Sequence, residues 1–237
     1  AVVDPTGKVI GTTVIYPTAP TTPQKIKASK DLLKKIIPKY HISLISLGNG
    51  TASRESEQFI VELLKEIPEQ VQYVIVNEAG ASVYSASKLA SEEFPKFDVG
   101  QRSAASIARR LQDPLAELVK IDPKSIGVGQ YQHDMNQKRL GEALGGVVED
   151  CVNSVGVDLN TASPALLSYV AGINTAVAKN ILKYREEHGK FTARRELLKV
   201  AKLGPKASEP SPGFLRMPES AKPQDSKGVH PKHHSAR

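Results

Sequence analysis

Residues 166–181 read LLSYVAGINTAVAKNI, and residues 197–206 read LLKVAKLGPK. In both stretches apolar residues at helical spacing lead into a turn that contains glycine, and in the first they resume after it. The pattern predicts two tandem helix–hairpin–helix units between Val157 and Lys206. Gly172 and Gly204 are expected at the turns, because glycine adopts a positive φ without steric cost.

The two predicted turns have the chemistry of phosphate-binding sites. Such a turn lets the first N–H groups of the next helix point at a phosphate oxygen, and nearby cations add attraction. Arg185, Arg194 and Arg195 are expected to add charge to the same region. The alternative is two ordinary helix pairs with solvated lysines, but the repeat with basic turns favours binding. The candidate binding residues are Gly172, Ile173, Asn174, Thr175, Lys179, Lys183, Lys202, Gly204 and Lys206.

Two helix starts are marked by the sequence. Ser163 followed by Pro164 is typical of an N-cap with proline at the first helical position. Asp134 and Gln137 have the spacing of a capping box, which predicts a long helix from there to about Ser154. Cys151 falls in this helix and is predicted to be a small core residue. As the single cysteine, it excludes an internal disulfide.

The first half of the chain alternates between strand and helix patterns. We predict an N-terminal hairpin around Pro5-Thr6-Gly7, and then helices and strands that together form a mixed α/β sheet. The loop from Gly48 to Thr51 follows a strand and could contact an anion, but it lacks the ending of a nucleotide-binding loop. A tight turn capped by Thr51 or Ser53 is favoured. The predicted helices are 25–40, 53–67, 82–91 and 103–120, and the later strands are 42–47 and 71–76.

Four segments resemble the Tex family of transcription accessory factors: 45–55 (ISLGNGTASRE), 77–87 (NEAGASVYSAS), 106–118 (SIARRLQDPLAEL) and 126–134 (IGVGQYQHD). The match extends to about Lys206. The resemblance implies an α/β RNase H-like domain of YqgF type that is N-terminally truncated, followed by an all-α helix–hairpin–helix domain. The OB-fold RNA-binding domain that follows in the family is expected to be absent. The implied divisions are 1–125 for the YqgF domain, 126–155 for a linker and connecting helix, 156–207 for the hairpin domain, and 208–237 for a tail expected to be disordered.

The RNase H-like resemblance also raises the possibility of a nuclease. Such enzymes hold two divalent metals between carboxylates. Glu78, after a strand, and Asp113, in a late helix, match by resemblance, but the family's central-strand aspartate is expected before Ala1. Asp4, near the hairpin turn, is a poor substitute. We therefore expect no catalysis and no cofactor, with Mg²⁺ entering only if a metal-dependent, junction-processing nuclease is the correct alternative.

Composition agrees with a nucleic-acid partner without proving one. The net charge is +7 and the isoelectric point about 9.4, which favours polyanionic partners. No apolar run approaches the roughly twenty residues that span a membrane, so a cytoplasmic protein is expected. The predicted function is sequence-tolerant binding of DNA or RNA in transcription, with a scaffold for the transcription machinery as a further alternative. Phosphate contacts carry little base information, so the choice between DNA and RNA stays open.

Overall fold

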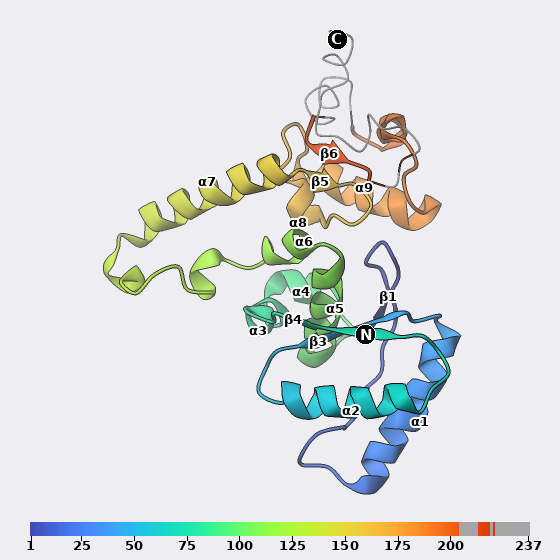
Figure 1. The fold of residues 1–237 in the computed structure, drawn as a ribbon. Helices are drawn as coiled ribbons and strands as arrows, with labels where there is room; N and C mark the ends of the chain where they lie inside the picture. The colour runs from blue at the N-terminus through green and yellow to red at the C-terminus, as the bar shows by residue number, and fades with distance from the viewer. Residues whose placement is uncertain (204–212, 219, 221–237) are drawn as a thin grey trace, which may run out of the picture. The chain divides into compact units, whose positions relative to one another are not determined.

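The computed structural model describes residues 1–203, 213–218 and 220. It forms two compact units, Ala1–Gln112 and Asp113–Arg237, rather than dividing after Ser125 as predicted (Figure 1). The earlier boundary has a physical cause, because Leu115 and Ala116 pack into the apolar core of the second unit. Asp113 is tied to the same unit, since its Oδ2 accepts a hydrogen bond from the Thr161 hydroxyl at 2.8 Å.

The first unit contains the predicted strands, but in two separate pairs. β1 (Val2–Val3) and β2 (Val9–Gly11) form the predicted antiparallel hairpin. β3 (Leu44–Gly48) and β4 (Gln72–Val76) pair in parallel, with Leu44 opposite Gln72 and Gly48 opposite Val76. Within the described part of the chain, no hydrogen-bonded ladder joins the two pairs. The mixed sheet is therefore present in two pieces.

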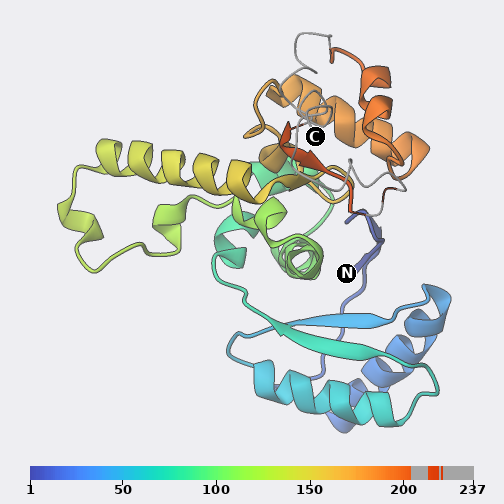
Figure 2. The same ribbon diagram turned by 45° about the horizontal axis from the view of Figure 1, so that its top comes forward.

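Helices cover both faces of the β3–β4 pair. α2 (Ser53–Lys65) packs on one face and α5 (Val99–Gln112) on the other (Figure 2). α1 (Pro23–Lys39) begins with Thr22 as N-cap and buries Ile37 in a small core with α2. Lys30 and Lys34 of α1 donate to Glu66 and hold the pKa of that carboxyl at about 2. Helices α1 and α2 confirm the predicted segments 25–40 and 53–67.

Two predicted helices are each broken into two. The segment 82–91 forms α3 (Ala81–Ser85) and α4 (Lys88–Glu93), because the Ser87 hydroxyl accepts from the N–H of Ala90 and starts a new helix. The segment 103–120 breaks at Pro114, which has no N–H to continue α5. α6 (Pro114–Leu118) follows with Asp113 as its N-cap. Asp113 therefore lies between two helices and not inside one.

The second unit is mainly helical. Short α8 (Pro164–Leu167) and α9 (Thr175–His188) pack in one apolar core with residues on both sides of them. β5 (Val157–Asp158) pairs in parallel with β6 (Leu215–Arg216). The described part of the unit also contains the 3₁₀ helices η1 (Pro123–Ser125), η2 (Gln132–Asp134) and the longer η3 (Arg194–Lys199).

Part of the predicted disordered tail is ordered. Leu215 and Met217 are 0% and 1% exposed, and both belong to the core of the second unit. The composition of 208–237 as a whole is polar, and this average concealed two apolar residues at the strand spacing of two. The tail prediction was therefore wrong for residues 213–218.

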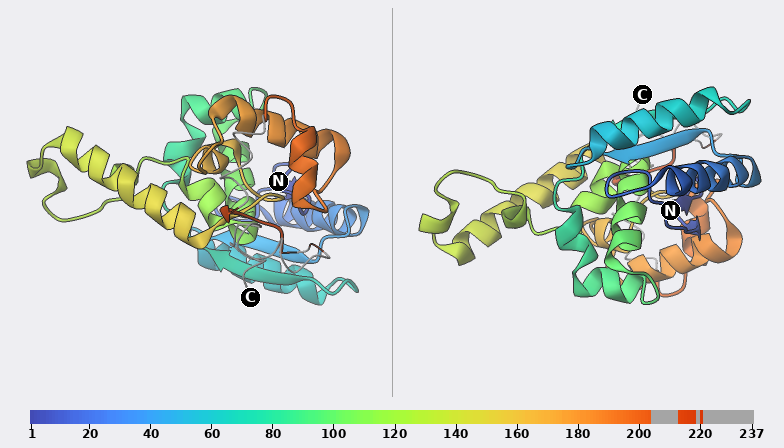
Figure 3. Two further views of the ribbon diagram at one scale, coloured as in Figure 1. Left: turned by 90° about the horizontal axis from the view of Figure 1, so that it is seen from above. Right: turned by 90° about the horizontal axis from the view of Figure 1, so that it is seen from below.

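The long helix α7 (Gln137–Val155) extends away from the α8–α9 core (Figure 3). Its N-cap is Asn136, whose side chain accepts from the N–H groups of Lys138 and Arg139, and so the predicted capping box at Asp134 was wrong. Leu140 and Val152 are its buried residues, whereas Cys151 is exposed. The core prediction for Cys151 failed because it lies beside Val152 on a helix that is buried along one face only. None of the helices in the described ranges has the length and apolar character needed to cross a membrane.

Candidate nucleic-acid interface

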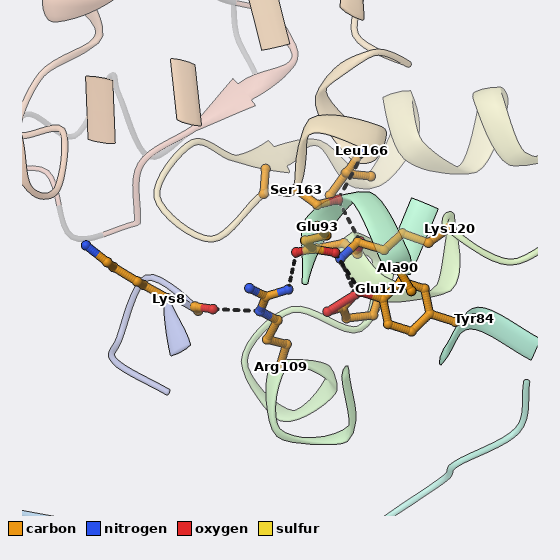
Figure 4. A network of polar contacts seen from close by, with 12 residues as sticks. Lys8, Tyr84, Ala90, Glu93, Arg109, Glu117, Lys120, Ser163 and Leu166 are labelled. Atoms are coloured by element: carbon orange, nitrogen blue, oxygen red, sulfur yellow. Dashed lines mark hydrogen bonds and ion pairs between the residues drawn. The ribbon is translucent and has the colours of Figure 1, made fainter. Parts of the chain in front are cut away.

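The first hairpin comprises α8, the turn 168–174 and α9. Ser163 caps α8 as predicted: its hydroxyl accepts from the N–H of Leu166 at 3.2 Å and donates to the Ala116 carbonyl at 2.6 Å (Figure 4). In the turn, the N–H of Ile173 donates to the Val170 carbonyl at 3.0 Å. Gly172 has a φ of +85°, which confirms the predicted positive φ. The chain thus reverses direction on a glycine.

The second hairpin, residues 197–203 in the described part of the chain, repeats this backbone pattern. The N–H of Leu203 donates to the Val200 carbonyl at 3.2 Å, as Ile173 does to Val170. The residue at a positive φ is Lys202, at +66°, in the position that Gly172 holds in the first hairpin. The predicted turn residue Gly204 and the neighbouring Lys206 lie outside the described residues. Within the described part, the second turn is therefore made by a lysine.

The candidate residues of the first turn have different roles. Ile173 is 4% exposed and its N–H is used inside the turn, so its contribution is to packing. Asn174 is the N-cap of α9, and its Oδ1 accepts from the N–H of Val177 at 2.9 Å. Thr175 and Ala176 are exposed, and their backbone N–H groups have no hydrogen-bond partner among the described residues. These two groups are free for an anion.

The basic residues separate into exposed and buried sets. Lys179 and Lys202 are exposed, as is Lys183, which has a weak ion pair with Glu187 at 3.8 Å. Lys199, which the pattern of turns did not single out, is also exposed just before the second turn. By contrast, Arg185 and Arg194 are 5% and 8% exposed. These two arginines do not add surface charge, contrary to expectation.

Arg185 has a structural task. Its Nη1 donates to the carbonyls of Leu159 and Ala162 at 3.1 and 3.0 Å, in the segment that leads into α8. A buried guanidinium needs such acceptors, because burying a charge without partners is very costly. The sequence alone did not reveal this, since the acceptors lie more than twenty residues away and belong to the backbone.

A contact between the two hairpins was also missed. The side-chain Nδ2 of Asn180, on α9, donates to the carbonyl of Ala201 at 2.8 Å. Ala201 directly precedes Lys202. No feature of the sequence pattern pairs these two positions, because the contact depends on how the second hairpin packs against α9.

The carboxylate Glu78 follows β4, as predicted, and its side chain lies over the loop between β3 and α2. A Cβ atom on Gly48 or Gly50 would overlap its carboxylate oxygens, so these glycines allow a close approach. The Asn49 Oδ1 also accepts from the N–H of Glu78 at 3.0 Å. The N-cap of α2 is Ala52, without a side-chain bond, so the predicted capping by Thr51 or Ser53 was wrong.

Both carboxylate oxygens of Asp113 accept hydrogen bonds within the second unit. Its Oδ1 accepts from the N–H of Ala116 at 3.2 Å, and its Oδ2 from Thr161. Glu93 is likewise engaged in the first unit, where it binds Arg109 at 2.5 Å and accepts from the Tyr84 hydroxyl (Figure 4). Across the described residues, no three His, Cys, Asp or Glu side chains gather in a group that could hold a metal ion.

Comparison with known proteins gives two family matches. Residues 1–112 match the Tex protein YqgF-like domain, and residues 152–216 match the helix-hairpin-helix motif. The first match ends where the first compact unit ends. Both halves of the predicted fold class are thereby confirmed, a YqgF-like, RNase H-like domain followed by a helix–hairpin–helix domain.

Similar full-length proteins come from bacteria and animals. "Uncharacterized protein YdcI" of Bacillus subtilis is 60% identical over 231 residues, which are 98% of this chain and 32% of that protein. "Transcriptional accessory protein Tex" of Neisseria gonorrhoeae is 53% identical over 235 residues, 98% of this chain and 30% of that protein. "S1 RNA-binding domain-containing protein 1" of Homo sapiens is 46% identical over 220 residues, 92% of this chain and 22% of that protein. The chain spans about a third or less of the length of these relatives.

Proposed function

Because this chain belongs to the Tex family, we propose that its second unit grips the phosphate backbone of nucleic acids, without sequence preference, as part of a transcription accessory factor. The observation that carries this proposal is the repeat of one turn geometry. The bond from Ile173 to Val170 recurs as the bond from Leu203 to Val200, each around a residue with a positive φ. Two turns of the same geometry supply two contacts to a repeating polymer.

The first turn can bind an anion through backbone N–H groups. The N–H groups of Thr175 and Ala176 start a helix of fourteen residues and have no partner among the described residues. Oriented N–H groups and the positive end of a helix dipole favour a phosphate oxygen there. Lys179, one turn further along α9, adds a cation.

The second turn can bind an anion through lysine side chains. Lys202 is exposed at the turn, and Lys199 precedes it by three residues. Ammonium groups attract phosphate without reading bases, which supports binding that tolerates any sequence. The human relative is named for an S1 RNA-binding domain, so RNA belongs among the ligands to test beside DNA.

The test is fluorescence anisotropy with labelled single- and double-stranded DNA and RNA over a salt series. We expect affinity to fall as salt rises, and expect Lys179→Glu/Lys202→Glu to abolish binding at moderate salt, because both phosphate contacts are lost. The matched control is Lys65→Glu/Lys96→Glu, which makes the same charge change at exposed lysines of the first unit. A folded chain that fails to bind even at low salt would refute the proposal and favour a protein-interaction scaffold.

We also propose that this chain does not cleave nucleic acid. Both oxygens of the Asp113 carboxylate accept hydrogen bonds from its own unit, which favours a structural role for it over metal binding together with Glu78. Incubation of the chain with Mg²⁺ or Mn²⁺ and labelled duplex, single-strand and junction substrates should leave all of them intact. Cleavage that Glu78→Gln abolishes would contradict this and support the nuclease alternative.

A further inference from the structure

The tip of the second hairpin is held by a side chain of the first. The Asn180 Nδ2 donates to the Ala201 carbonyl at 2.8 Å. Asn180 lies on α9 between the exposed Lys179 and the fully buried Ile181, so its backbone position is fixed by the core. The hydrogen bond therefore joins the second helix of one hairpin directly to the turn of the other.

This bond acts on the backbone conformation of Lys202. The peptide plane between Ala201 and Lys202 sets both the direction of the Ala201 carbonyl and the φ of Lys202. A lysine at a φ of +66° is disfavoured, because its Cβ crowds the backbone. A donor that fixes the carbonyl in its observed direction favours the left-handed turn over extended alternatives. Residues held in such conformations need this kind of support from their surroundings.

The same bond brings two cations to neighbouring positions. Lys179 precedes Asn180, and Lys202 follows Ala201, so the backbones that carry the two lysines are linked through the Asn180 side chain and its hydrogen bond. Both lysines are exposed, and the described residues offer neither of them an ion-pair partner. The two lysines come from different hairpins, and each is next in sequence to one of the two residues that this bond joins.

We propose that Asn180 is a positioning residue of the nucleic-acid interface, whose amide holds the second turn so that Lys202 and Lys179 contact phosphates of one nucleic-acid segment together. This inference rests on the proposed function of the second unit. Two contacts on one rigid support bind more tightly than two independent ones, because the second contact becomes intramolecular. Asn180 touches no phosphate itself and acts through Lys202.

The experiment measures binding of the full chain to labelled nucleic acid over a salt series, for Asn180→Ala, Lys202→Ala and the double variant. We expect each single variant to raise the Kd by about fivefold and to lower the slope of log K against log salt by about 0.9, the value for one phosphate contact. The double variant should bind within about twofold of Lys202→Ala, because Asn180 acts only through that lysine.

Gln137→Ala is the matched control for stability. Gln137 donates through its Nε2 to the carbonyls of Gln132 and Met135, each at 2.9 Å, so the change removes similar amide-to-carbonyl bonds at the start of α7, outside both hairpins. Its thermal midpoint should be close to that of Asn180→Ala, while its affinity and salt slope stay at the wild-type values. Asn180→Gln, which keeps a donor on a longer side chain, should recover part of the lost affinity.

Three outcomes would overturn the inference. They are wild-type affinity in Asn180→Ala, an unchanged salt slope in that variant, and losses that add in the double variant. In all three cases the wild-type chain still binds, so the proposed function survives. If the wild-type chain does not bind at low salt, the proposed function and this inference fall together.

Discussion

The two hairpins of the second unit have the same backbone pattern but rest on different residues. The first turns on Gly172 at a φ of +85°, and the second on Lys202 at +66°. Glycine reaches this conformation at no steric cost, whereas other L-residues are disfavoured there by about 1–2 kcal/mol. The first turn is therefore built into the local sequence, and the second requires support from outside its own segment.

The contacts next to the two turns differ in the same way, although Arg185 also holds the segment before the first hairpin from more than twenty residues away. Around the first, Ser163 and Asn174 cap the helices within three residues of their own positions. The second is held by the Asn180 amide, by burial of Val200 and Leu203, and by their packing in the common core. A turn supported by distant residues can carry a side chain that glycine lacks. The comparison therefore indicates that tertiary contacts stabilise the positive φ of Lys202.

Among the variants that test this difference between the hairpins, Arg185→Ala is expected to cause the largest loss of stability. The change leaves the carbonyls of Leu159 and Ala162 buried without their donor, next to the start of the first hairpin. We expect the free energy of unfolding of the second unit to fall by about 3 kcal/mol, as for other buried charged donors. Urea unfolding followed by circular dichroism measures this. Arg195→Ala, at an exposed neighbour of Arg194, is the control and should change stability by less than about 0.5 kcal/mol.

If Arg185→Ala is no more destabilising than Arg195→Ala, the first hairpin does not depend on its buried arginine. The claim that hairpin one is locally determined would then be strengthened, and the structural role given to Arg185 would be wrong.

Gly172→Ala is expected to cause a smaller loss of stability than Arg185→Ala. Alanine at a φ of +85° should lower the free energy of unfolding by about 1–2 kcal/mol. Lys202→Ala is the matched change in the second hairpin. It should cost less than about 0.5 kcal/mol, because that position already carries a Cβ at a positive φ. If urea unfolding shows that both variants lose the same free energy of unfolding, the two turns do not differ in backbone strain as stated above.

The smallest effect on stability, with an opposite effect on binding, is expected from Lys202→Gly. Stability should stay level or rise by up to about 1 kcal/mol, since the left-handed strain is relieved while glycine loses more entropy on folding. Affinity for nucleic acid should fall, and the salt slope should become shallower by about 0.9. Lys138→Ala, at an exposed position of α7, serves as the binding control. A Lys202→Gly variant that binds as tightly as the wild type would show that this lysine is only a turn residue.

Much of the fold was predictable where the determining contacts are local. The helix starts at Ser163, the strand positions before and after α2, and the positive φ at Gly172 were all predicted from neighbouring residues. Helix ends were less predictable. The break at Pro114 was missed because apolar spacing continues through it, although proline has no N–H to donate.

The site was predictable as a region and less so residue by residue. Lys179 and Lys202 are exposed as a binding role requires, but Arg185 and Arg194 are buried, and Ile173 belongs to the core. Asn180 was not predicted at all. A basic residue near a turn has the same sequence signature whether its charge faces solvent or carbonyl oxygens, because the acceptors come from segments far along the chain.

By itself, the sequence determined the tandem hairpins, the α/β character of the first unit and the glycine turn, because these depend on periodicity, capping and backbone sterics within a few residues. Only the tertiary structure decided that Lys202 makes the second turn, that Asn180 holds it, and that Asp113 joins the second unit. Those outcomes depend on which distant groups meet when the core closes. Burial and hydrogen bonding between remote residues leave no periodic trace in the chain.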